Sequence, residues 1–260
     1  TDSLTGEVAQ LRKEKPDMVH SMTPKAGLLC MMAAKMAGVP VRVHTFTGLV
    51  WPTSTGLIRQ ILIWTDKLTC ACATHVIPEG EGVKQDLQRC ITRKPLKVLG
   101  YGNVKGIDLQ YWKRTAPAEP HETVTFIFVG RLVREKGINE LVAAFVQLNK
   151  RYPQTRLLLV GPYEEKIDPH MPETMRLLDE CEAIEAVGRQ TDERPFREPS
   201  DVRVCPSYRE GFPNVVIEAG AMDLPSIVTD INGAREIIVN HENGLIVPPR
   251  DEAALYEAME

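Results

Sequence analysis

Short apolar runs alternate with stretches of helical periodicity along almost the whole chain, and this alternation constrains the fold more than any other feature. Residues 124–129 and 202–205 have the length and composition of buried strands, whereas residues 56–68 and 137–150 repeat apolar side chains at helical spacing. Parallel strands need helical crossovers, so strands that alternate with helices predict parallel sheets covered on both faces. The chain is therefore predicted to be an α/β protein.

The individual elements are expected where apolar runs are bounded by glycine, proline and polar residues. The expected strands are residues 18–20, 41–44, 72–77, 97–99, 124–129, 156–160, 184–187, 202–205, 226–228 and 245–247. The expected helices are residues 4–13, 24–37, 56–68, 81–91, 137–150, 171–181, 213–222 and 234–239, with a last one starting at residue 251. Two irregularities interrupt this pattern: Arg203 lies inside a buried strand, and residues 191–200 are poor in apolar residues where an amphipathic helix is expected.

A segment without periodicity divides the alternating pattern into two halves. Residues 113–123 contain Pro117, Pro120 and several charged residues, which is typical of a linker. We therefore expect two α/β domains, residues 1–115 and residues 116–260, that face each other across a cleft. The chain begins with a helix rather than a strand, so the N-terminal domain is expected to be incomplete, and the C-terminal helix to be truncated.

Composition excludes several classes of protein. The 260 residues are 43% hydrophobic and 25% charged, as in soluble globular domains. The formal net charge of -4 gives no general attraction to nucleic acid. No apolar stretch reaches the length of a membrane span, so a cytoplasmic protein is expected. The six cysteines have no paired spacing typical of zinc sites, which favours reduced thiols and no bound metal.

The residues that follow the strand 124–129 are suited to a diphosphate. Gly130 and Gly137 allow the backbone to approach a ligand closely, while Arg131 and Lys136 bring cations to the same strand end. Taken alone, the segment also fits a solvated basic turn.

A second group of candidate residues follows the strand 202–205. Pro213 suits the first turn of a helix, and the amides that follow it form an anion site. Glu218 lies four residues beyond Asn214 on the same helical face, where its carboxylate can accept hydrogen bonds from both hydroxyls of a ribose. Glu210 precedes the helix and is expected to face a sugar beyond the phosphates. The expected donor-binding residues are Gly130, Arg131, Lys136, Phe212, Pro213, Asn214, Val215 and Glu218.

With these residues in place, the second half resembles the nucleotide-binding domain of family 4 retaining glycosyltransferases, whose signature is two glutamates separated by seven residues, here Glu210 and Glu218. The segments 128–137, 157–162, 225–231 and 243–248 carry the same resemblance. Residues 44–48, 99–108 and 207–214 are most similar to bacterial enzymes that build capsular, O-antigen or N-glycan chains on undecaprenyl diphosphate, including N-acetylgalactosaminyltransferases.

This resemblance implies a GT-B fold with two Rossmann-like domains and a retaining transfer of a hexose or N-acetylhexosamine from a UDP-sugar. It assigns Arg131 and Lys136 to the diphosphate, Glu218 to the ribose and Glu210 to the transferred sugar, with His44 approaching the sugar from across the cleft. Glu210 and His44 are thus the candidate catalytic residues, although a histidine that ends a strand is also commonly structural. No Asp-x-Asp motif occurs, so no metal cofactor is expected.

The resemblance also implies a lipid-linked or glycan acceptor and peripheral contact with the cytoplasmic face of the inner membrane. Residues 51–64 combine aromatic, aliphatic and basic residues that would suit a membrane surface. Their apolar spacing equally fits a core helix, which is the favoured interpretation for residues 56–68. Trp51, in the preceding loop, is the candidate for acceptor or membrane contact.

Three other functions compete with glycosyl transfer. The first is a dinucleotide oxidoreductase, because residues 100–106 approximate a dinucleotide-binding glycine motif, but the third glycine comes one position late. A UDP-sugar 2-epimerase shares the GT-B fold. A truncated nucleotide-binding fragment with little activity is the third alternative.

Overall fold

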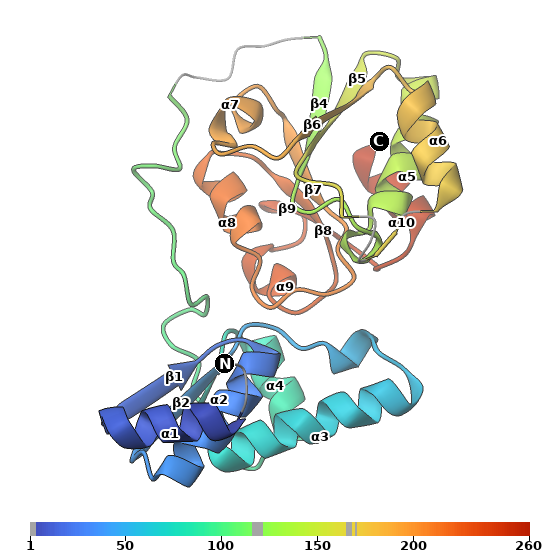
Figure 1. Cartoon of the computed structure of the whole chain (residues 1–260). Coiled ribbons are helices and arrows are strands. Elements are labelled where there is room, and N and C mark those ends of the chain that lie inside the picture. Colours follow the sequence, from blue (N-terminus) through green and yellow to red (C-terminus); the bar gives the residue numbers. More distant parts are fainter. Residues whose placement is uncertain (1–3, 116–121, 165–167, 170) are drawn as a thin grey trace. The chain divides into compact units, whose positions relative to one another are not determined.

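The computed structural model describes residues 4–115, 122–164, 168–169 and 171–260, which form two compact units, Thr1–Val104 and Lys105–Glu260 (Figure 1). Residues 116–121, in the segment expected to be the linker, lie outside the described residues. The part of that segment just before them packs on the second unit, because Arg114 donates to the carbonyl oxygens of Met222 and Ser200. The domain boundary at residue 115 stays a prediction.

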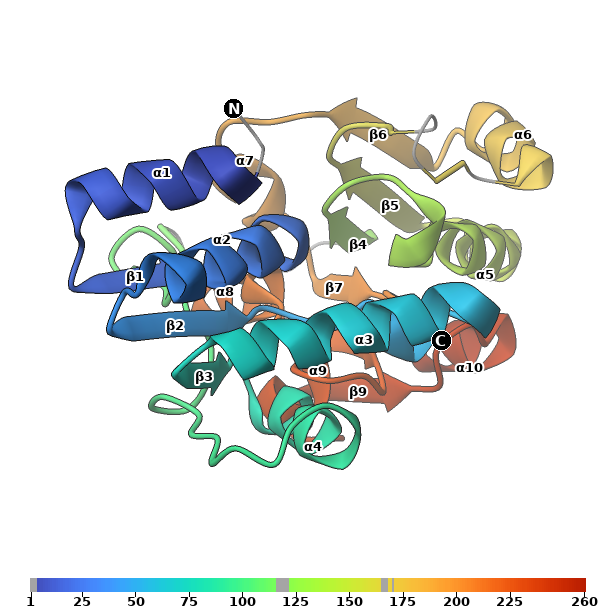
Figure 2. The same ribbon diagram turned by 60° about the horizontal axis from the view of Figure 1, so that its bottom comes forward.

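The first unit is a parallel sheet with helices packed against it. Its described strands pair in the order β1-β2-β3, with Met18 opposite Val41 and Val43 opposite His75. Helix α1 packs on α2, and α2 packs on α3 (Figure 2). The elements are α1 (Leu4–Glu14), β1 (Met18–Ser21), α2 (Pro24–Ala37), β2 (Val41–Phe46), the 3-10 turn η1 (Trp51–Thr53), α3 (Gly56–Cys72), β3 (His75–Pro78) and α4 (Glu81–Cys90).

The second unit is a larger parallel sheet whose described strands follow the order β6-β5-β4-β7-β8-β9. The chain winds outward from β4 in one direction and then from β7 in the other, which is the Rossmann-like, doubly wound arrangement. The elements are β4 (Val124–Val129), the 3-10 turn η2 (Arg134–Lys136), α5 (Ile138–Arg151), β5 (Thr155–Val160), α6 (Pro172–Glu180), β6 (Ile184–Gly188), α7 (Arg194–Arg197), β7 (Val202–Cys205), α8 (Asn214–Ala221), β8 (Ser226–Thr229), α9 (Ala234–Ile237), β9 (Gly244–Val247) and α10 (Glu252–Met259).

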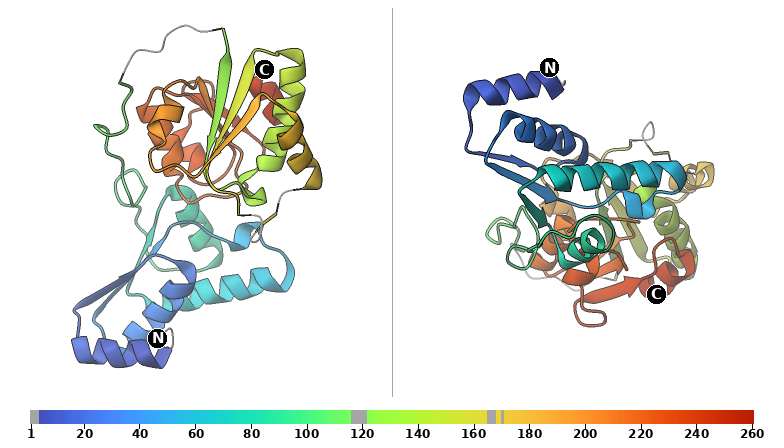
Figure 3. Two further views of the ribbon diagram at one scale, coloured as in Figure 1. Left: turned by 45° about the horizontal axis from the view of Figure 1, so that its top comes forward. Right: turned by 90° about the horizontal axis from the view of Figure 1, so that it is seen from below.

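Alternating side chains of the second sheet bury two opposite faces, as expected for a parallel sheet covered on both sides. Phe126 and Phe128 of β4 pack in the cluster formed with α5, where the Phe126 and Phe145 rings meet edge to face at 6.4 Å. Ile127 and Val129 point the other way. Figures 1 and 3 show α5, α6 and α10 on one side of this sheet, and Figure 1 shows α7, α8 and α9 on the other.

Two sequence-based expectations about local structure were wrong. Residues 97–99 form no strand: Leu96 before them is buried, but Leu99 is 55% exposed and the segment pairs with no strand of the sheet. The glycine-rich segment 100–106 therefore lacks the preceding strand that a dinucleotide site requires. Cys72 ends helix α3 instead of beginning β3, since the apolar periodicity of that helix continues for one more turn. The irregularity noted at residues 191–200 agrees with the structure, where this segment contains only the single turn α7.

The loops at the carboxyl ends of β4 and β7 are in close contact at Gly137. This residue adopts the left-handed conformation, with φ +73, between η2 and α5. A Cβ atom there would overlap the Pro206 carbonyl oxygen in the loop after β7. Glycine is thus required for both its backbone conformation and the close approach of the two loops.

We expect Gly137→Ala to lower the free energy of unfolding by about 3 kcal/mol or more, because left-handed strain and overpacking add at this position. Gly188 is the matched control: its φ is +69, but a Cβ atom there would meet nothing within 4 Å. Gly188→Ala should therefore lose only the conformational part, about 1–2 kcal/mol. Urea unfolding of both variants measures the difference, and equal losses would contradict the close packing of the two loops.

Candidate functional site

The candidate site lies where the strand order of the second sheet reverses, between β4 and β7. Ligands of doubly wound sheets bind at this position, beyond the carboxyl ends of the strands. The Tyr208 backbone N–H in the loop after β7 donates to the Glu135 carbonyl oxygen in the loop after β4, at 2.9 Å. Gly130 N–H donates to the Val160 carbonyl oxygen, also at 2.9 Å, so the end of β5 joins the same surface. The structure thus brings together the two loops that the sequence singled out.

Lys136 and Glu210, one from each loop, form an ion pair in this site. The Lys136 Nζ lies 2.5 Å from Glu210 Oε1, which also accepts a hydrogen bond from Ser207 Oγ at 2.8 Å. Both charged side chains are about four-fifths buried. An ammonium group has three donors, so Lys136 can bind an anion while Glu210 still holds it in place.

Arg131 takes part in a second, more exposed charge network. It donates to Glu164 at 3.0 Å and to Glu135 at 3.1 Å. Both hydrogen bonds raise the pKa of the Arg131 guanidinium, and the bond to Glu164 has the larger effect. Arg209 also donates to Glu135, at 2.7 Å. Exposed ion pairs of this kind contribute about 0–1 kcal/mol each. A diphosphate could therefore replace these carboxylates as the partner of Arg131 at little cost.

Helix α8 begins one residue later than the sequence indicated. Pro213 is the residue before the helix, with φ -71 and ψ 101, and its carbonyl oxygen accepts from Val216 N–H at 3.0 Å. Asn214 and Val215 form the first turn, where backbone amides and the helix dipole favour anions. Phe212 is half-buried in the loop just before them.

Glu218 lies one turn further along α8 and is held by a buried arginine. Its Oε2 accepts from Arg197 Nη2 at 2.9 Å, and the Arg197 side chain is fully buried. Burial raises the pKa of the Glu218 carboxyl, and the nearby Arg197 guanidinium opposes that shift. Within the described part of the chain, no hydrogen bond to Glu218 Oε1 is seen, so this oxygen can accept one from a ligand hydroxyl.

Arg203, the irregularity in β7, points to the same side of the sheet. Val202 and Val204 pack in the cluster on the α5 face, so the alternation of the strand turns Arg203 toward α7 and α8. Its Nη2 donates to the Val129 carbonyl oxygen at 3.4 Å, and burial lowers the pKa of its guanidinium. Arg203 also contributes to the positive potential around Glu218.

Sequence reasoning missed Arg197 as a residue of this site. The only signal was the low apolar content of residues 191–200, where Arg197 takes the buried position that an aliphatic residue would fill. A buried arginine needs charged or polar partners, and Glu193, Glu218 and the Val215 carbonyl oxygen supply them. Glu193 lies four residues before Arg197, but Val215 and Glu218 belong to a different helix and could not be identified from spacing.

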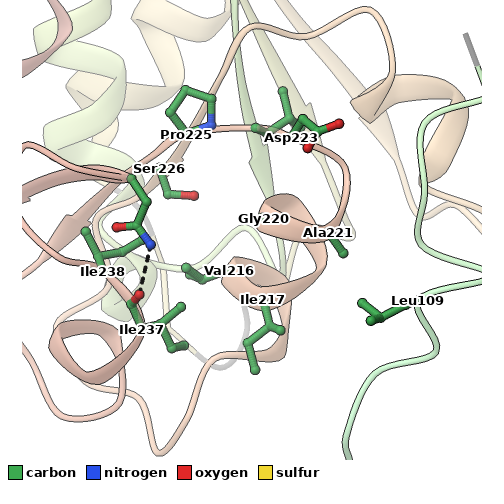
Figure 4. A pocket seen from close by; sticks show the side chains of 12 residues that line it. Leu109, Val216, Ile217, Gly220, Ala221, Asp223, Pro225, Ser226, Ile237 and Ile238 are labelled. Atoms are coloured by element: carbon green, nitrogen blue, oxygen red, sulfur yellow. Dashed lines mark hydrogen bonds between the residues drawn. The ribbon is translucent and has the colours of Figure 1, made fainter. Parts of the chain in front are cut away.

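A separate cavity of about 500 Å³ lies on the other side of α8, between that helix, α9 and the start of β8 (Figure 4). Val216, Gly220, Ser226 and Ile237 line it, with Leu109 from the segment that enters the second unit. Because Ser226 begins β8, the cavity is at the amino ends of the strands, opposite the candidate site. It is therefore not part of that site.

His44 belongs to the first unit and is buried in its interior, with 1% of its surface exposed. Its Nδ1 forms a 2.7 Å hydrogen bond with Ser21 Oγ, and its ring meets Phe46 edge to face at 4.5 Å. A side chain at Gly27 of α2 would overlap the His44 ring. The lack of a side chain at Gly27 thus lets α2 approach the His44 ring closely. The predicted contact of His44 with a sugar stays a prediction.

Neither a metal-binding cluster nor a membrane-spanning helix is found among the described residues. No group of three or more histidine, cysteine, aspartate or glutamate side chains there could hold a metal ion. No helix there combines the length and the apolar composition needed to cross a membrane.

Solved structures share this fold over nearly the whole chain. The crystal structure of Anabaena HepE in complex with UDP aligns with a TM-score of 0.80 and 19% identity, covering 98% of this chain and 70% of HepE. Sucrose-phosphate synthase of Thermosynechococcus elongatus aligns with a TM-score of 0.80 and 25% identity, covering 98% and 66%. The fold is that of the GT-B glycosyltransferases, as expected.

Sequence comparison then identifies the family. Residues 123–260 match the family of glycosyl transferases group 1, and residues 3–102 match the glycosyl transferase 4-like domain. The chain belongs to the glycosyl transferases group 1 and is a glycosyltransferase.

Two curated relatives resemble this chain along most of its length. The capsular polysaccharide biosynthesis glycosyltransferase CapM of Staphylococcus aureus is 32% identical, over 99% of this chain and 70% of CapM. An alpha-1,3-galactosyltransferase of Escherichia coli, named for UDP-Gal and alpha-D-GlcNAc-diphosphoundecaprenol, is 27% identical, over 96% of this chain and 67% of the enzyme.

The burial of His44 generates a prediction about pH. Burial, and to a lesser degree His20, lowers the pKa of His44 to about 4, from 6.5. Between these two pH values the unfolded chain binds a proton that the folded state does not. The contribution of His44 to the free energy of unfolding is therefore fully present above pH 6.5 and falls as the pH falls toward 4. The expected loss of free energy of unfolding is about 3 kcal/mol.

His44→Gln should remove this pH-dependent loss, as measured by urea unfolding from pH 7 to pH 4. Asp66 in the same unit acts in the opposite direction, because burial raises the pKa of its carboxyl to about 6. The variant must therefore be compared with the wild type at each pH. His75→Gln is the control, because His75 is exposed. An unchanged slope in His44→Gln would show that His44 is not the buried titrating group.

Proposed function

We propose that this chain is a retaining glycosyltransferase that moves a hexose or N-acetylhexosamine from a UDP-sugar to a lipid-linked glycan in bacterial surface polysaccharide synthesis. The observation that carries the proposal is the arrangement of Glu210 and Glu218 around the start of α8, at the reversal of strand order. CapM supports the polysaccharide class, and the name of the Escherichia coli relative supports both UDP and an undecaprenyl-diphosphate acceptor.

Each donor group has a suitable partner in the site. Glu218 Oε1 would accept from the ribose hydroxyls, because the bond to Arg197 occupies Oε2. The first amides of α8, with Arg131 and Lys136, would bind the diphosphate, which needs no metal cofactor in this scheme. Glu210 would face the transferred sugar. The structures of HepE in complex with UDP and with UDP-glucose support a nucleotide-sugar donor.

In the proposed reaction the acceptor hydroxyl attacks the anomeric carbon on the face from which the diphosphate leaves. The bond between that carbon and the phosphate oxygen breaks, a bond to the acceptor oxygen forms, and the departing phosphate takes the acceptor proton. Lys136 and the α8 amides stabilise the charge that develops on the leaving group. Glu210 positions the sugar, and its ion pair with Lys136 joins sugar binding to phosphate binding.

The proposal has two finer parts, a lipid-linked acceptor and a resemblance to N-acetylgalactosaminyltransferases. A lipid-linked acceptor is favoured by a cavity of about 330 Å³ in the first unit, which lies beyond the carboxyl end of β2 and is within the range of small-molecule sites. Its wall is mainly apolar, with Leu28, Val50 and Leu62, and it includes Lys25 and Asp66 as charged groups. An amphipathic ligand with an apolar chain and a polar head matches this lining.

Helix α3 supports contact with a membrane surface. Four large apolar side chains, Leu57, Ile58, Ile61 and Trp64, are 53–76% exposed and lie along one side of the helix. The interpretation of residues 56–68 as a core helix was therefore wrong for this side, which the described residues of the first unit leave exposed. Trp51 was the wrong candidate for the membrane: it is 2% exposed and lines the cavity instead.

The division of roles between the two glutamates can be tested by substitution. Glu218→Ala should weaken UDP binding at least about tenfold, because a charge-assisted hydrogen bond contributes about 1.5–3 kcal/mol. Glu210→Ala should leave UDP affinity within about twofold and abolish turnover with UDP-sugars and a lipid-linked acceptor. Calorimetry measures UDP binding and mass spectrometry measures the products. Equal UDP affinity in both variants would contradict the assignment, and an epimerised donor formed without acceptor would favour a 2-epimerase.

The membrane surface on α3 can be tested by vesicle sedimentation. Ile61→Ser with Trp64→Ser should lower binding to phosphatidylethanolamine–phosphatidylglycerol vesicles at least about tenfold, because each buried apolar side chain contributes about 1.5–3 kcal/mol. Tyr101→Ser is the control, since Tyr101 is fully exposed in the same unit but lies outside α3. Unchanged binding in the double variant, or an equal loss in the control, would contradict a membrane role for this helix.

A further inference from the structure

Arg197 connects α7 to the first two turns of α8. Its Nη1 donates to the Val215 carbonyl oxygen at 3.1 Å, and its Nη2 donates to Glu193 at 2.8 Å and to Glu218 at 2.9 Å. The whole guanidinium is buried, so these contacts fix its position without competition from solvent. The orientation of the Glu218 carboxylate therefore depends on Arg197.

Two aromatic residues from the segment that enters the second unit stack on the arginines of α7. The Trp112 ring lies over the Arg197 guanidinium at 4.9 Å, and the Tyr111 ring lies under that of Arg194 at 3.9 Å. The two rings meet edge to face at 5.2 Å. Arg197 is thus enclosed between α8 and this segment.

Polar contacts fix the same segment at the ends of α7 and α8. Arg114 donates to the Met222 carbonyl oxygen at 2.8 Å, after the end of α8. The Thr115 hydroxyl donates to Glu198, the residue after α7, at 2.7 Å. The position of Trp112 over Arg197 is therefore determined by a docked segment rather than by a single stacking contact.

These contacts have a direct consequence for recognition of a ribose. A carboxylate that is to accept from two adjacent hydroxyls must be ionised and must hold its plane. Burial favours the protonated form of Glu218, whereas Arg197 favours the ionised form and occupies one oxygen. Removing the guanidinium would leave Glu218 more often protonated and free to rotate.

We propose that Arg197 is a positioning residue that orients Glu218 for the ribose hydroxyls, and that Trp112 holds Arg197 in that position. Recognition of the ribose then depends on the docked segment 105–115, which precedes the second sheet. This inference rests on the proposed function, because it takes Glu218 as the ribose-binding residue.

The test compares the affinity of the 260-residue protein for UDP with its affinity for 2′,3′-dideoxy-UDP, by calorimetry. The two ligands share base and diphosphate, so the ratio of affinities reports only on the ribose hydroxyls. We expect the wild type to prefer UDP by about tenfold to a hundredfold, as charge-assisted hydrogen bonds imply. Arg197→Met should reduce the ratio to about one to threefold, and Arg197→Lys and Trp112→Ala should reduce it severalfold.

A neighbouring arginine on the same helix provides a matched control. Arg194→Met removes an arginine that also stacks on an aromatic ring, but Arg194 bonds to Asp192 rather than to Glu218. This variant should keep the wild-type ratio. A role for Arg197 in stability alone would weaken both ligands equally, leaving the ratio unchanged. If Arg197→Met does not fold, the lysine and Trp112 variants still measure the effect.

The outcomes separate this inference from the function on which it rests. A wild type that binds no UDP, or that shows no preference over the dideoxy ligand, overturns the ribose role of Glu218 and this inference with it. A wild-type preference that persists in Arg197→Met, Arg197→Lys and Trp112→Ala overturns only the positioning role. A ratio lost equally in the Arg194→Met variant also overturns it, because the effect would then be general to α7.

Discussion

The reversal of strand order between β4 and β7 is the constraint on which the functional part of this protein depends. Parallel strands expose their carboxyl ends at one edge of the sheet, and the connections after β4 and β7 lead to opposite sides of it. The loops that follow these strands therefore meet at the point of reversal. Gly137 allows their close approach, and the backbone bond from Tyr208 to Glu135 fixes it.

Charges at this point are balanced rather than uniformly positive. Lys136 pairs with Glu210 and Arg131 pairs with Glu135 and Glu164, so each cation is oriented by a carboxylate. Deeper in the unit, Arg197 pairs with Glu218 where solvent cannot screen the interaction. The more exposed pairs of Arg131 exchange partners at little cost, whereas breaking the buried pair of Arg197 and Glu218 would leave an uncompensated charge. This difference suits the outer residues to a leaving group and the inner ones to a fixed binding contact.

Much of the architecture could be predicted from periodicity. The bounds of α2, β4 and β7 agree with the sequence-based expectation, because apolar period and flanking breakers are local properties. The wrong expectations concern residues whose environment is set by distant parts of the chain. Residues 97–99 are apolar enough for a strand but have no place in the sheet, and Trp51 of the expected surface loop is buried.

The residues of the candidate site also divide into those that could be predicted from the sequence and those that could not. The glutamates, glycines and basic residues of the two loops could be named from the sequence, since strand ends and helix starts determine where a ligand binds. Arg197 and Trp112 could not, because their importance comes from contacts with Glu218 and with each other across three separate segments.

The sequence by itself determined the alternating α/β pattern, the position of the loops of the candidate site and the family resemblance, all of which depend on residues close together in the chain. Only the tertiary structure decided which carboxylates are paired, that Arg203 points toward α7 and α8, and that α3 exposes an apolar side. These properties follow from burial and long-range contacts, and the free energy of a charge or an apolar side chain depends on the surroundings that folding gives it.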